Sequence, residues 1–181
     1  MARAQPKREA LEAEDGLSLA IRNVRGRGEP AVARRKTPRV SPRCQALVLC
    51  ERVILNAETM RNSVVEILDG ISATSVPFTV GPLMVYARLI GGTGGYAIRF
   101  EIHDLNANEI VAATGESLIE FGNTEAVLIL TANFPPIELT GPGPYDLVAF
   151  VDDQDIARST FHVVPDQGED GNNGAQDDDE S

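Results

Sequence analysis

Apolar and polar residues alternate through the middle of the chain, most clearly over residues 96–104. Every second position there is apolar: Tyr96, Ile98, Phe100 and Ile102. The positions between them hold Ala97, Arg99, Glu101 and His103. A period of two places successive side chains on opposite faces of a strand, whereas a helix needs apolar positions three and four apart. We therefore predict a strand that turns its first set toward a core and its second set toward water.

Turn-forming residues flank this strand on both sides. The run Gly91-Gly92-Thr93-Gly94-Gly95 permits positive φ angles, and the asparagines of residues 105–108 favour a second reversal. Apolar runs continue beyond both breaks. These features predict a β-meander over residues 83–111, which the remaining strands are expected to cover.

Several other segments have the composition of strands. Residues 46–56 change phase at Glu51-Arg52, which indicates a bulge or a strand that passes between two sheets. Residues 64–68 are the next predicted strand. Residues 109–121 exceed an ordinary strand length, so we expect a bend at Gly115. Residues 126–132 are nearly all apolar, which is typical of a strand buried on both faces.

The chain is predicted to end its fold with a hairpin of residues 145–151 and 156–163 around an acidic turn at 152–155. Its expected inward residues are Tyr145, Leu147, Ala149, Val151, Phe161 and Val163. Pro77 and Pro82 exclude the long loop at 71–82 from a central sheet position, and the segment 133–144 is predicted to be a proline-rich crossing loop. Seven to eight short strands without an internal helix predict an all-β fold, an antiparallel immunoglobulin-like β-sandwich.

Charge divides the chain into three parts. Residues 1–44 hold eleven Lys and Arg against five Asp and Glu, and residues 45–165 hold five against fifteen. Residues 166–181 hold seven acidic residues and no basic one. We predict a basic, mostly disordered arm at 1–44, a β-sandwich domain at 45–165, and an acidic disordered tail at 166–181. A native start downstream of Met1 is an alternative explanation for the arm.

The two tails suggest few partners by themselves. Arg34-Arg35-Lys36 could contact phosphates, but no aromatic residue lies between the bases of the arm to stack on single strands. We interpret the arm as a solvated tail and do not expect nucleic acid as a partner. The acidic tail is interpreted as a solubilising segment rather than a docking motif.

Cysteine usage and hydropathy favour a cytoplasmic protein. Cys44 and Cys50 are the only cysteines, and in an extended strand their Cα atoms would lie roughly 20 Å apart, too far for a disulfide. No apolar run approaches the ~20 residues of a membrane helix, so we expect no membrane insertion. The charged N-terminus lacks the apolar region of a signal peptide.

Four motifs, in this order, give the chain a resemblance to a known family. They are Cys50-Glu51-Arg52-Val53, Val85-Tyr86-Ala87-Arg88-Leu89 with its glycine turn, Phe100-Glu101-Ile102-His103-Asp104, and the closing hairpin from Gly143. With them, residues 46–164 resemble an uncharacterised bacterial family known only as a domain of unknown function. The closing hairpin also resembles that of immunoglobulin-like modules. The resemblance implies a small sandwich and supplies no activity, cofactor or catalytic residue.

The residues that could carry chemistry do not form a recognised constellation. His103 and His162 are both expected to face solvent, and Cys50 lies among strand residues like a small core side chain. A nucleophilic triad or a zinc site would need these groups paired with suitable partners. We therefore predict no catalytic residue, no metal and no cofactor.

Two acidic turns have some of the features of a calcium site. Residues 104–109 begin like a calcium loop but have Glu109 where the loop needs Gly and Gly115 where it needs a bidentate acid. The second turn contains Asp152, Asp153 and Asp155. Counting strands places the two turns at opposite ends of the sandwich, so a shared site is not expected.

The leading functional hypothesis is a non-catalytic module that binds a protein partner through loops on a rigid scaffold. Its candidate contact residues are Pro77, Phe78, Phe134 and Ile137, which could instead close the end of the core. A self-assembling structural subunit, whose basic arm reaches the acidic body of another copy, is the alternative. A calcium-dependent ligand-binding domain is a third hypothesis.

Overall fold

The structure, a computed structural model, describes residues 39–166. These residues form strands, turns and bends, with no helix among them. The strands are β1 (Arg43–Asn56), β2 (Arg61–Ile67), β3 (Gly70–Ala73), β4 (Phe78–Val80), β5 (Leu83–Ile90), β6 (Gly94–Asp104), β7 (Glu109–Ala113), β8 (Ser117–Phe121), β9 (Val127–Phe134), β10 (Ile137–Leu139), β11 (Gly143–Val151) and β12 (Gln154–Pro165). The predicted all-β fold is confirmed, with more strands than expected and with several of them, such as β1, β6 and β12, longer than predicted.

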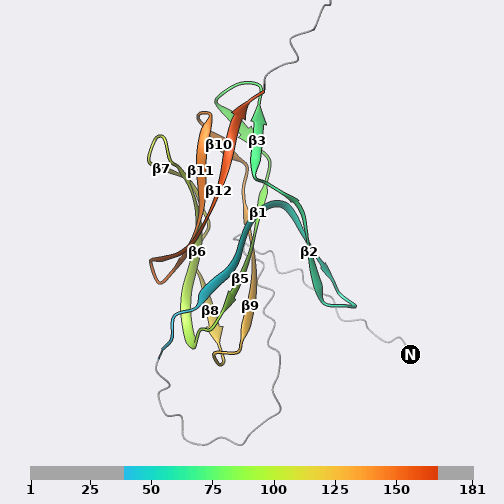
Figure 1. Ribbon diagram of the computed structural model, residues 1–181, viewed down its shortest axis with the longest axis vertical. Helices are drawn as coiled ribbons and strands as arrows, with labels where there is room; N and C mark the ends of the chain where they lie inside the picture. The colour runs from blue at the N-terminus through green and yellow to red at the C-terminus, as the bar shows by residue number, and fades with distance from the viewer. Residues whose placement is uncertain (1–38, 167–181) are drawn as a thin grey trace, which may run out of the picture.

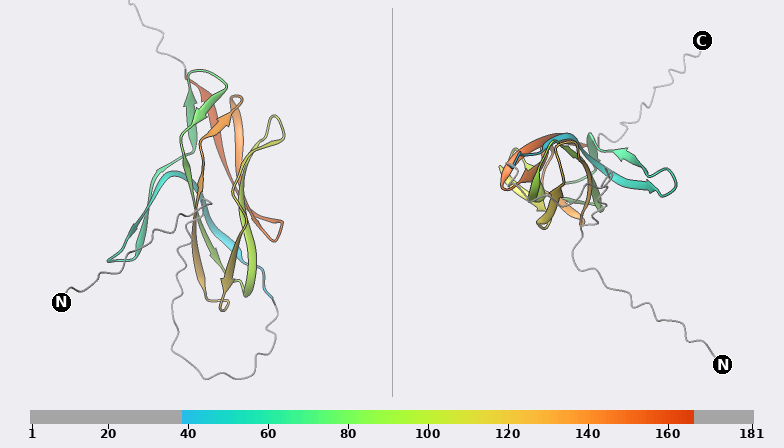
Figure 2. Two further views of the ribbon diagram at one scale, coloured as in Figure 1. Left: turned by 180° about the vertical axis from the view of Figure 1, so that it is seen from behind. Right: turned by 90° about the horizontal axis from the view of Figure 1, so that it is seen from below.

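The strands form two main layers (Figures 1 and 2). One sheet has the order β2-β1-β5-β9. The other has the order β3-β12-β11-β6-β7, with β8 also pairing with β6. All pairings are antiparallel except the parallel one between β12 and β3. A separate two-stranded piece joins β10 to β4.

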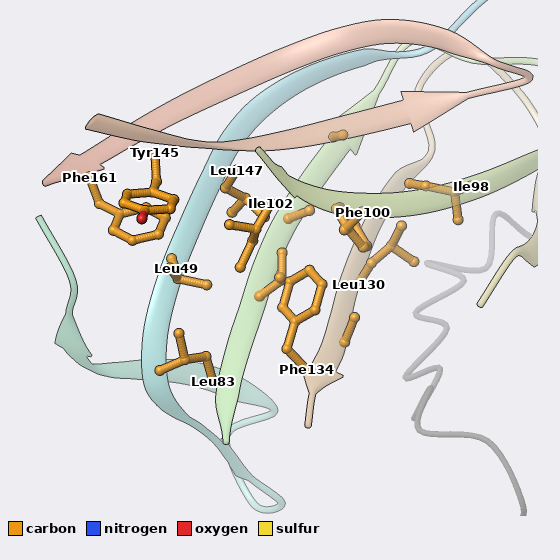
Figure 3. Close-up of a cluster of buried hydrophobic side chains, with 14 of the residues drawn as sticks. Leu49, Leu83, Ile98, Phe100, Ile102, Leu130, Phe134, Tyr145, Leu147 and Phe161 are labelled. Carbon is orange, nitrogen blue, oxygen red and sulfur yellow. The ribbon is translucent and has the colours of Figure 1, made fainter. Parts of the chain in front are cut away.

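The core lies between the two layers. Figure 3 shows side chains of β6, β11 and β12 pointing toward those of β1, β5 and β9. The predicted inward set of β6 is confirmed: Tyr96, Ile98, Phe100 and Ile102 are all buried. The predicted inward set of the closing hairpin is buried as well: Tyr145, Leu147, Ala149, Val151, Phe161 and Val163. Strand alternation therefore places the core as expected.

The predicted meander is wrong in its first half. β5 belongs to the four-stranded sheet and β6 to the six-stranded sheet, so the glycine run carries the chain from one layer to the other. Gly91 and Gly94 adopt φ angles of 78° and 89°, which other residues rarely adopt. Gly92 passes close to the Phe121 ring in the core. The glycines thus serve a change of layer, while the predicted β6–β7 hairpin is confirmed.

Other segments depart from the expected pattern in smaller ways. The loops at 71–82 and 133–144 contain β4 and β10 and part of β3, which lie outside the centre of the main sheets. β9 is buried on its inward face only, since Val127 and Ile129 on its other face stay partly exposed among the residues that the structure describes. At the predicted bend near Gly115 the extended segment divides into β7 and β8. Thr114 fills this break, since its hydroxyl accepts a hydrogen bond of 2.9 Å from the Phe100 amide.

The described chain begins before the expected boundary at residue 45. Val40 already bridges to Thr93, and β1 begins at Arg43. The rest of the predicted basic arm, residues 1–38, and residues 167–181 of the predicted acidic tail lie outside the described residues.

Gly92→Ala is expected to lower the free energy of unfolding by about 1–3 kcal/mol. A Cβ atom at this position would lie 2.8 Å from Cδ2 of Phe121, and the ring is 2% exposed and packs edge-on against Tyr96. Urea denaturation followed by circular dichroism measures the loss. Gly115→Ala is the control, because no atom lies within 4 Å of its added Cβ. Equal stability of the two variants would contradict the packing at Gly92.

Candidate interaction surface

A hairpin formed by the end of β1 and by β2 projects from the body of the molecule (Figures 1 and 2). Residues 43–50 of β1 pair with β5, and residues 50–56 pair with β2 instead. The phase change at Glu51-Arg52 therefore marks the place where β1 leaves the body. Asn56 shapes the tip, since its side-chain oxygen accepts hydrogen bonds from the amides of Glu58 and Thr59 at 3.0 and 2.9 Å.

The hairpin exposes large apolar side chains. Ile54, Leu55, Met60 and Ile67 are 46%, 47%, 41% and 57% exposed, respectively. Val53, Val64 and Val65 are half-buried. Among the described residues, no other segment of this length exposes as many large apolar side chains. Exposed apolar surface concentrated in this way marks contact sites on soluble proteins.

The register of the hairpin separates its charges by face. Residues directly opposite in an antiparallel pair share a face. Arg52 lies opposite Val65, Ile54 opposite Ser63, and Asn56 opposite Arg61. We call this side, with Arg52, Ile54, Arg61 and Val65, the arginine face.

The opposite side of the hairpin carries the acidic residues. Val53 lies opposite Val64, and Leu55 lies opposite Asn62. Glu51 and Glu66 share this side and interact, so that the pKa of Glu51 is raised by a hydrogen bond with Glu66 and by the repulsion between the two carboxylates. We call this side, with Glu51, Val53, Leu55, Val64 and Glu66, the glutamate face.

A groove of about 850 Å³ adjoins the base of the hairpin. Glu51 lines it together with Pro82, Met84, residues 113–117 and residues 133–135. None of the lining residues is basic, and Glu116 adds a second carboxylate to the groove. The backbone amide of Val53 lies 3.4 Å from the sulfur of Met84, which links the glutamate face to the groove. The two surfaces are therefore continuous at Glu51.

The four sequence-predicted contact residues are not all at the surface. Pro77 is exposed and Phe78 is half-buried against the core. Phe134 is fully buried and Ile137 is 3% exposed. These two side chains close the core, which was the alternative interpretation of them. None of the four belongs to the projecting hairpin.

The sequence does not predict this hairpin as exposed, because its apolar residues resemble those of a strand in the core. The signal was present in the segment 51–56, where the phase of alternation changes and apolar residues occupy adjacent positions. Adjacent apolar residues place hydrophobic side chains on both faces of a strand. Such a strand needs cover on two sides, and the body of this molecule supplies it only to residues before Glu51.

A second cluster of functional groups lies on the outer face of the six-stranded sheet. Glu101 accepts a hydrogen bond of 2.8 Å from Nε of Arg99, and its other oxygen lies 2.7 Å from Nε2 of His103. The Phe150 ring contacts both basic side chains, with the Arg99 guanidinium 4.5 Å from its centre and the His103 ring stacked at 6.3 Å. Both His103 and Glu101 were expected to face solvent, but His103 is half-buried and Glu101 is only 7% exposed.

This cluster covers the central strand of its sheet. Val148 points outward from β11 and is nevertheless fully buried. Next to it Asp146 accepts a hydrogen bond of 2.6 Å from Thr160 and pairs with Arg158 at 3.4 Å. Burial would raise the pKa of Glu101, but the hydrogen bonds from Arg99 and His103 outweigh it and hold the pKa below its usual range. Because the carboxylates of Glu101 and Asp146 are both paired, we interpret this cluster as structural.

The acidic turns use their carboxylates to hold the backbone. One oxygen of Asp104 accepts hydrogen bonds from the amides of Asn106 and Ala107 at 2.8 and 2.9 Å. Asp152 accepts one from the Ala97 amide at 2.9 Å and pairs with Arg39. Because Asp104 ends β6 and Ala97 lies near its start, the turns sit at opposite ends of that strand, as predicted. Within residues 39–166, no three His, Cys, Asp or Glu side chains are grouped to hold a metal ion.

The two cysteines are free, and Cys50 is fully buried. Burial raises the pKa of the Cys50 thiol, which disfavours the reactive thiolate. The other histidine, His162, is exposed as predicted. The part of the chain described here contains no helix that is long and apolar enough to cross a membrane.

Comparison with known proteins gives one family. The model of DUF6941, a family of unknown function, matches residues 45–164. The chain belongs to this family. The resemblance to a domain of unknown function noted from the four sequence motifs is thereby confirmed. The matched range includes the whole projecting hairpin, so the hairpin is part of the family domain.

Structural comparison adds little. The chain resembles the solved structure of Pseudomonas fluorescens alkylpurine DNA glycosylase AlkC bound to DNA containing an abasic site analog, at 7% identity and a TM-score of 0.40. The match covers 68% of this chain and only 30% of the glycosylase chain. This likeness is too low to bear on function. Among curated proteins no match was found.

Phe134→Ala is expected to lower the free energy of unfolding by about 3–5 kcal/mol, because the ring is fully buried and leaves a cavity. Thermal and urea denaturation measure the change. Leu118→Ala is the control, since Leu118 is 79% exposed and its truncation is expected to change stability by less than about 0.5 kcal/mol. An unchanged stability of the Phe134→Ala variant would show that this ring is a surface contact after all.

Glu101→Gln is expected to reduce the dependence of stability on acidic pH. The pKa of Glu101 is lowered on folding, so its contribution is present above the unfolded pKa and is lost as pH falls through the folded pKa. The unfolding free energy of the wild type should therefore fall more steeply than that of the variant below about pH 4.3, the usual glutamate pKa. Parallel pH profiles would contradict the pairing. Glu138→Gln, at an exposed position, is the control.

Proposed function

We propose that this domain is a non-catalytic module that binds a protein partner through the projecting hairpin. The observation that carries the proposal is the exposure of Ile54, Leu55, Met60 and Ile67 on one two-stranded extension of the body. A two-stranded hairpin is marginally stable by itself in water. Cover from a partner would bury these side chains and stabilise the hairpin.

The edge of the hairpin supports the same function. β2 is the last strand of its sheet, so the backbone groups on its outer side face away from β1. Such an edge can pair with a strand of another protein. The apolar side chains on both faces would then supply affinity, and the charges would supply orientation.

The arrangement of potential catalytic groups also supports a binding role. The His103–Glu101 pair is held by Arg99 and Phe150 in a cluster that covers Val148. A nucleophilic mechanism would need a hydroxyl or thiol beside the histidine. Cys50, the buried cysteine, lies in β1 with its sulfur 3.4 Å from the Met84 carbonyl oxygen.

We further propose that the two layers form an immunoglobulin-like sandwich of a cytoplasmic protein. The start of the closing hairpin supports the fold, because the Tyr145 hydroxyl donates a hydrogen bond of 2.8 Å to the carbonyl of Gly141, four residues upstream. A tyrosine that bonds back to the backbone in this way is a feature of such sandwiches. The free thiols of Cys44 and Cys50 support a reducing compartment.

Replacing Ile54 and Leu55 together by Ser is expected to abolish capture of protein partners from an extract of the native host. The change removes apolar contact area from both faces of the hairpin and leaves the core intact, because both side chains are exposed. Captured proteins are identified by mass spectrometry and compared with those of the wild type.

Leu118→Ser is the matched control, since it removes an equally large exposed side chain from β8. Circular dichroism verifies that both variants fold. Capture of the same proteins by the hairpin variant and the wild type would show that the hairpin is not the binding surface. Loss of capture by the Leu118 variant alone would move the surface to β8.

A further inference from the structure

The two faces of the projecting hairpin are complementary to each other. The arginine face carries Arg52 and Arg61 and no acidic strand residue, whereas the glutamate face carries Glu51 and Glu66 and no basic one. Both faces also hold an exposed apolar residue at nearly the same position along the hairpin, because Ile54 and Leu55 are neighbours in one strand. The two faces therefore carry opposite charges beside similar apolar surface.

Neither charged pair forms an ion pair of opposite sign within the described residues, although the charge of Arg52 partly opposes the rise in the pKa of Glu51. Neither Arg52 nor Arg61 forms an ion pair with another residue of the described range. Glu51 and Glu66 instead interact with each other, and like charges opposite each other across two strands are destabilising. A guanidinium placed beside the two carboxylates would remove this repulsion and form charge-assisted hydrogen bonds.

We propose that the arginine face of one hairpin docks on the glutamate face of a second copy of this chain, so that copies associate head to tail. This inference rests on the proposed function, which makes the hairpin the binding surface, and it names the partner. Arg52 and Arg61 meet Glu51 and Glu66 of the next copy. Ile54 and Val65 pack against its Val53, Leu55 and Val64.

The groove at the base of the hairpin extends the acceptor surface. It is continuous with the glutamate face through Glu51, holds Glu116 and has no basic lining residue. With a volume of about 850 Å³, it has room for side chains from the edge of an incoming hairpin. Met84 and Pro82 give it apolar walls. A hairpin that presents Ile54 beside two arginines fits this lining in both polarity and charge.

The association must be head to tail because opposite faces of one hairpin are used. In a two-fold dimer the same patch contacts itself, or two patches exchange reciprocally. If the arginine face of one hairpin covers the glutamate face of another, the second hairpin's own arginine face points away from the first. Each added copy therefore leaves one face of each kind free, and the contact is heterologous.

The neighbouring residues Ile54 and Leu55 allow a direct test with the purified full chain. Ile54→Asp places an acid on the arginine face, and Leu55→Arg places a base on the glutamate face, each at a side chain that is nearly half exposed. Each variant keeps its other face intact. Analytical ultracentrifugation measures the mass over a range of concentrations at low and high salt, and circular dichroism verifies folding.

We expect the wild type to form species larger than a dimer at low salt and to dissociate as salt screens the charges. Each variant by itself should lose association at least about tenfold, which corresponds to about 1.4 kcal/mol, because a charge of the same sign as the facing residues replaces an apolar contact. An equimolar mixture of the two variants should form a 1:1 dimer and stop there, because one glutamate face and one arginine face remain to pair.

Three outcomes would overturn the proposal: a wild type that stays monomeric at every concentration, variants that associate like the wild type, or a mixture that stays monomeric. A monomeric wild type that still captures a different protein through Ile54 and Leu55 would overturn only the head-to-tail contact. Failure of the proposed function would have a different result: the Ile54/Leu55 double-serine variant would capture the same proteins as the wild type. The two failures are therefore distinguishable.

Discussion

The structure depends on how far the pairing of β1 with β5 extends along β1. From Arg43 to Cys50 this pairing holds β1 in the four-stranded sheet, and its inward side chains enter the core. β5 begins at Leu83, so residues of β1 beyond Cys50 have no body strand beside them. β2 then supplies the only neighbour of this half of β1 among the described strands. One continuous strand thus belongs to a buried sheet at one end and to an exposed hairpin at the other.

The sequence predicts the parts of the fold that depend on local alternation. β6, β11 and β12 have their inward residues where a period of two places them, because each has one face on the core. Alternation alone does not specify which sheet a strand joins. The run Gly91–Gly95 is compatible with a tight hairpin and with a change of layer, and the pairing of β5 and β6 in different sheets, with Gly92 packed on Phe121, distinguishes them. The short strands β4 and β10 escaped prediction for a related reason, since three residues give no period.

The candidate site was less predictable than the fold. The place of Phe134 and Ile137 in a long loop region predicts that they contact a partner. Hydrophobic side chains beside prolines can also close the end of a core, and both residues are buried there. The hairpin, in contrast, has no loop composition, and its apolar residues resemble those of a core strand. Its exposure follows from the length of β5 and from the position of β2, and both are features of the tertiary structure that the local sequence does not specify. The opposite charges of its faces follow only from the register of β1 on β2.

Charges on the two sheets behave differently because of what surrounds them. On the outer face of the six-stranded sheet, Glu101 and Asp146 each have basic or hydroxyl partners and cover the buried Val148. On the hairpin, Glu51 and Glu66 have each other, and the nearby arginines lie on the opposite face. A sheet that satisfies its charges internally gains a stable outer surface. The hairpin carries its two signs on opposite faces without an ion pair between them, and it exposes apolar residues beside them. In the proposed association, these charges would gain partners like those that the outer face of the six-stranded sheet already has.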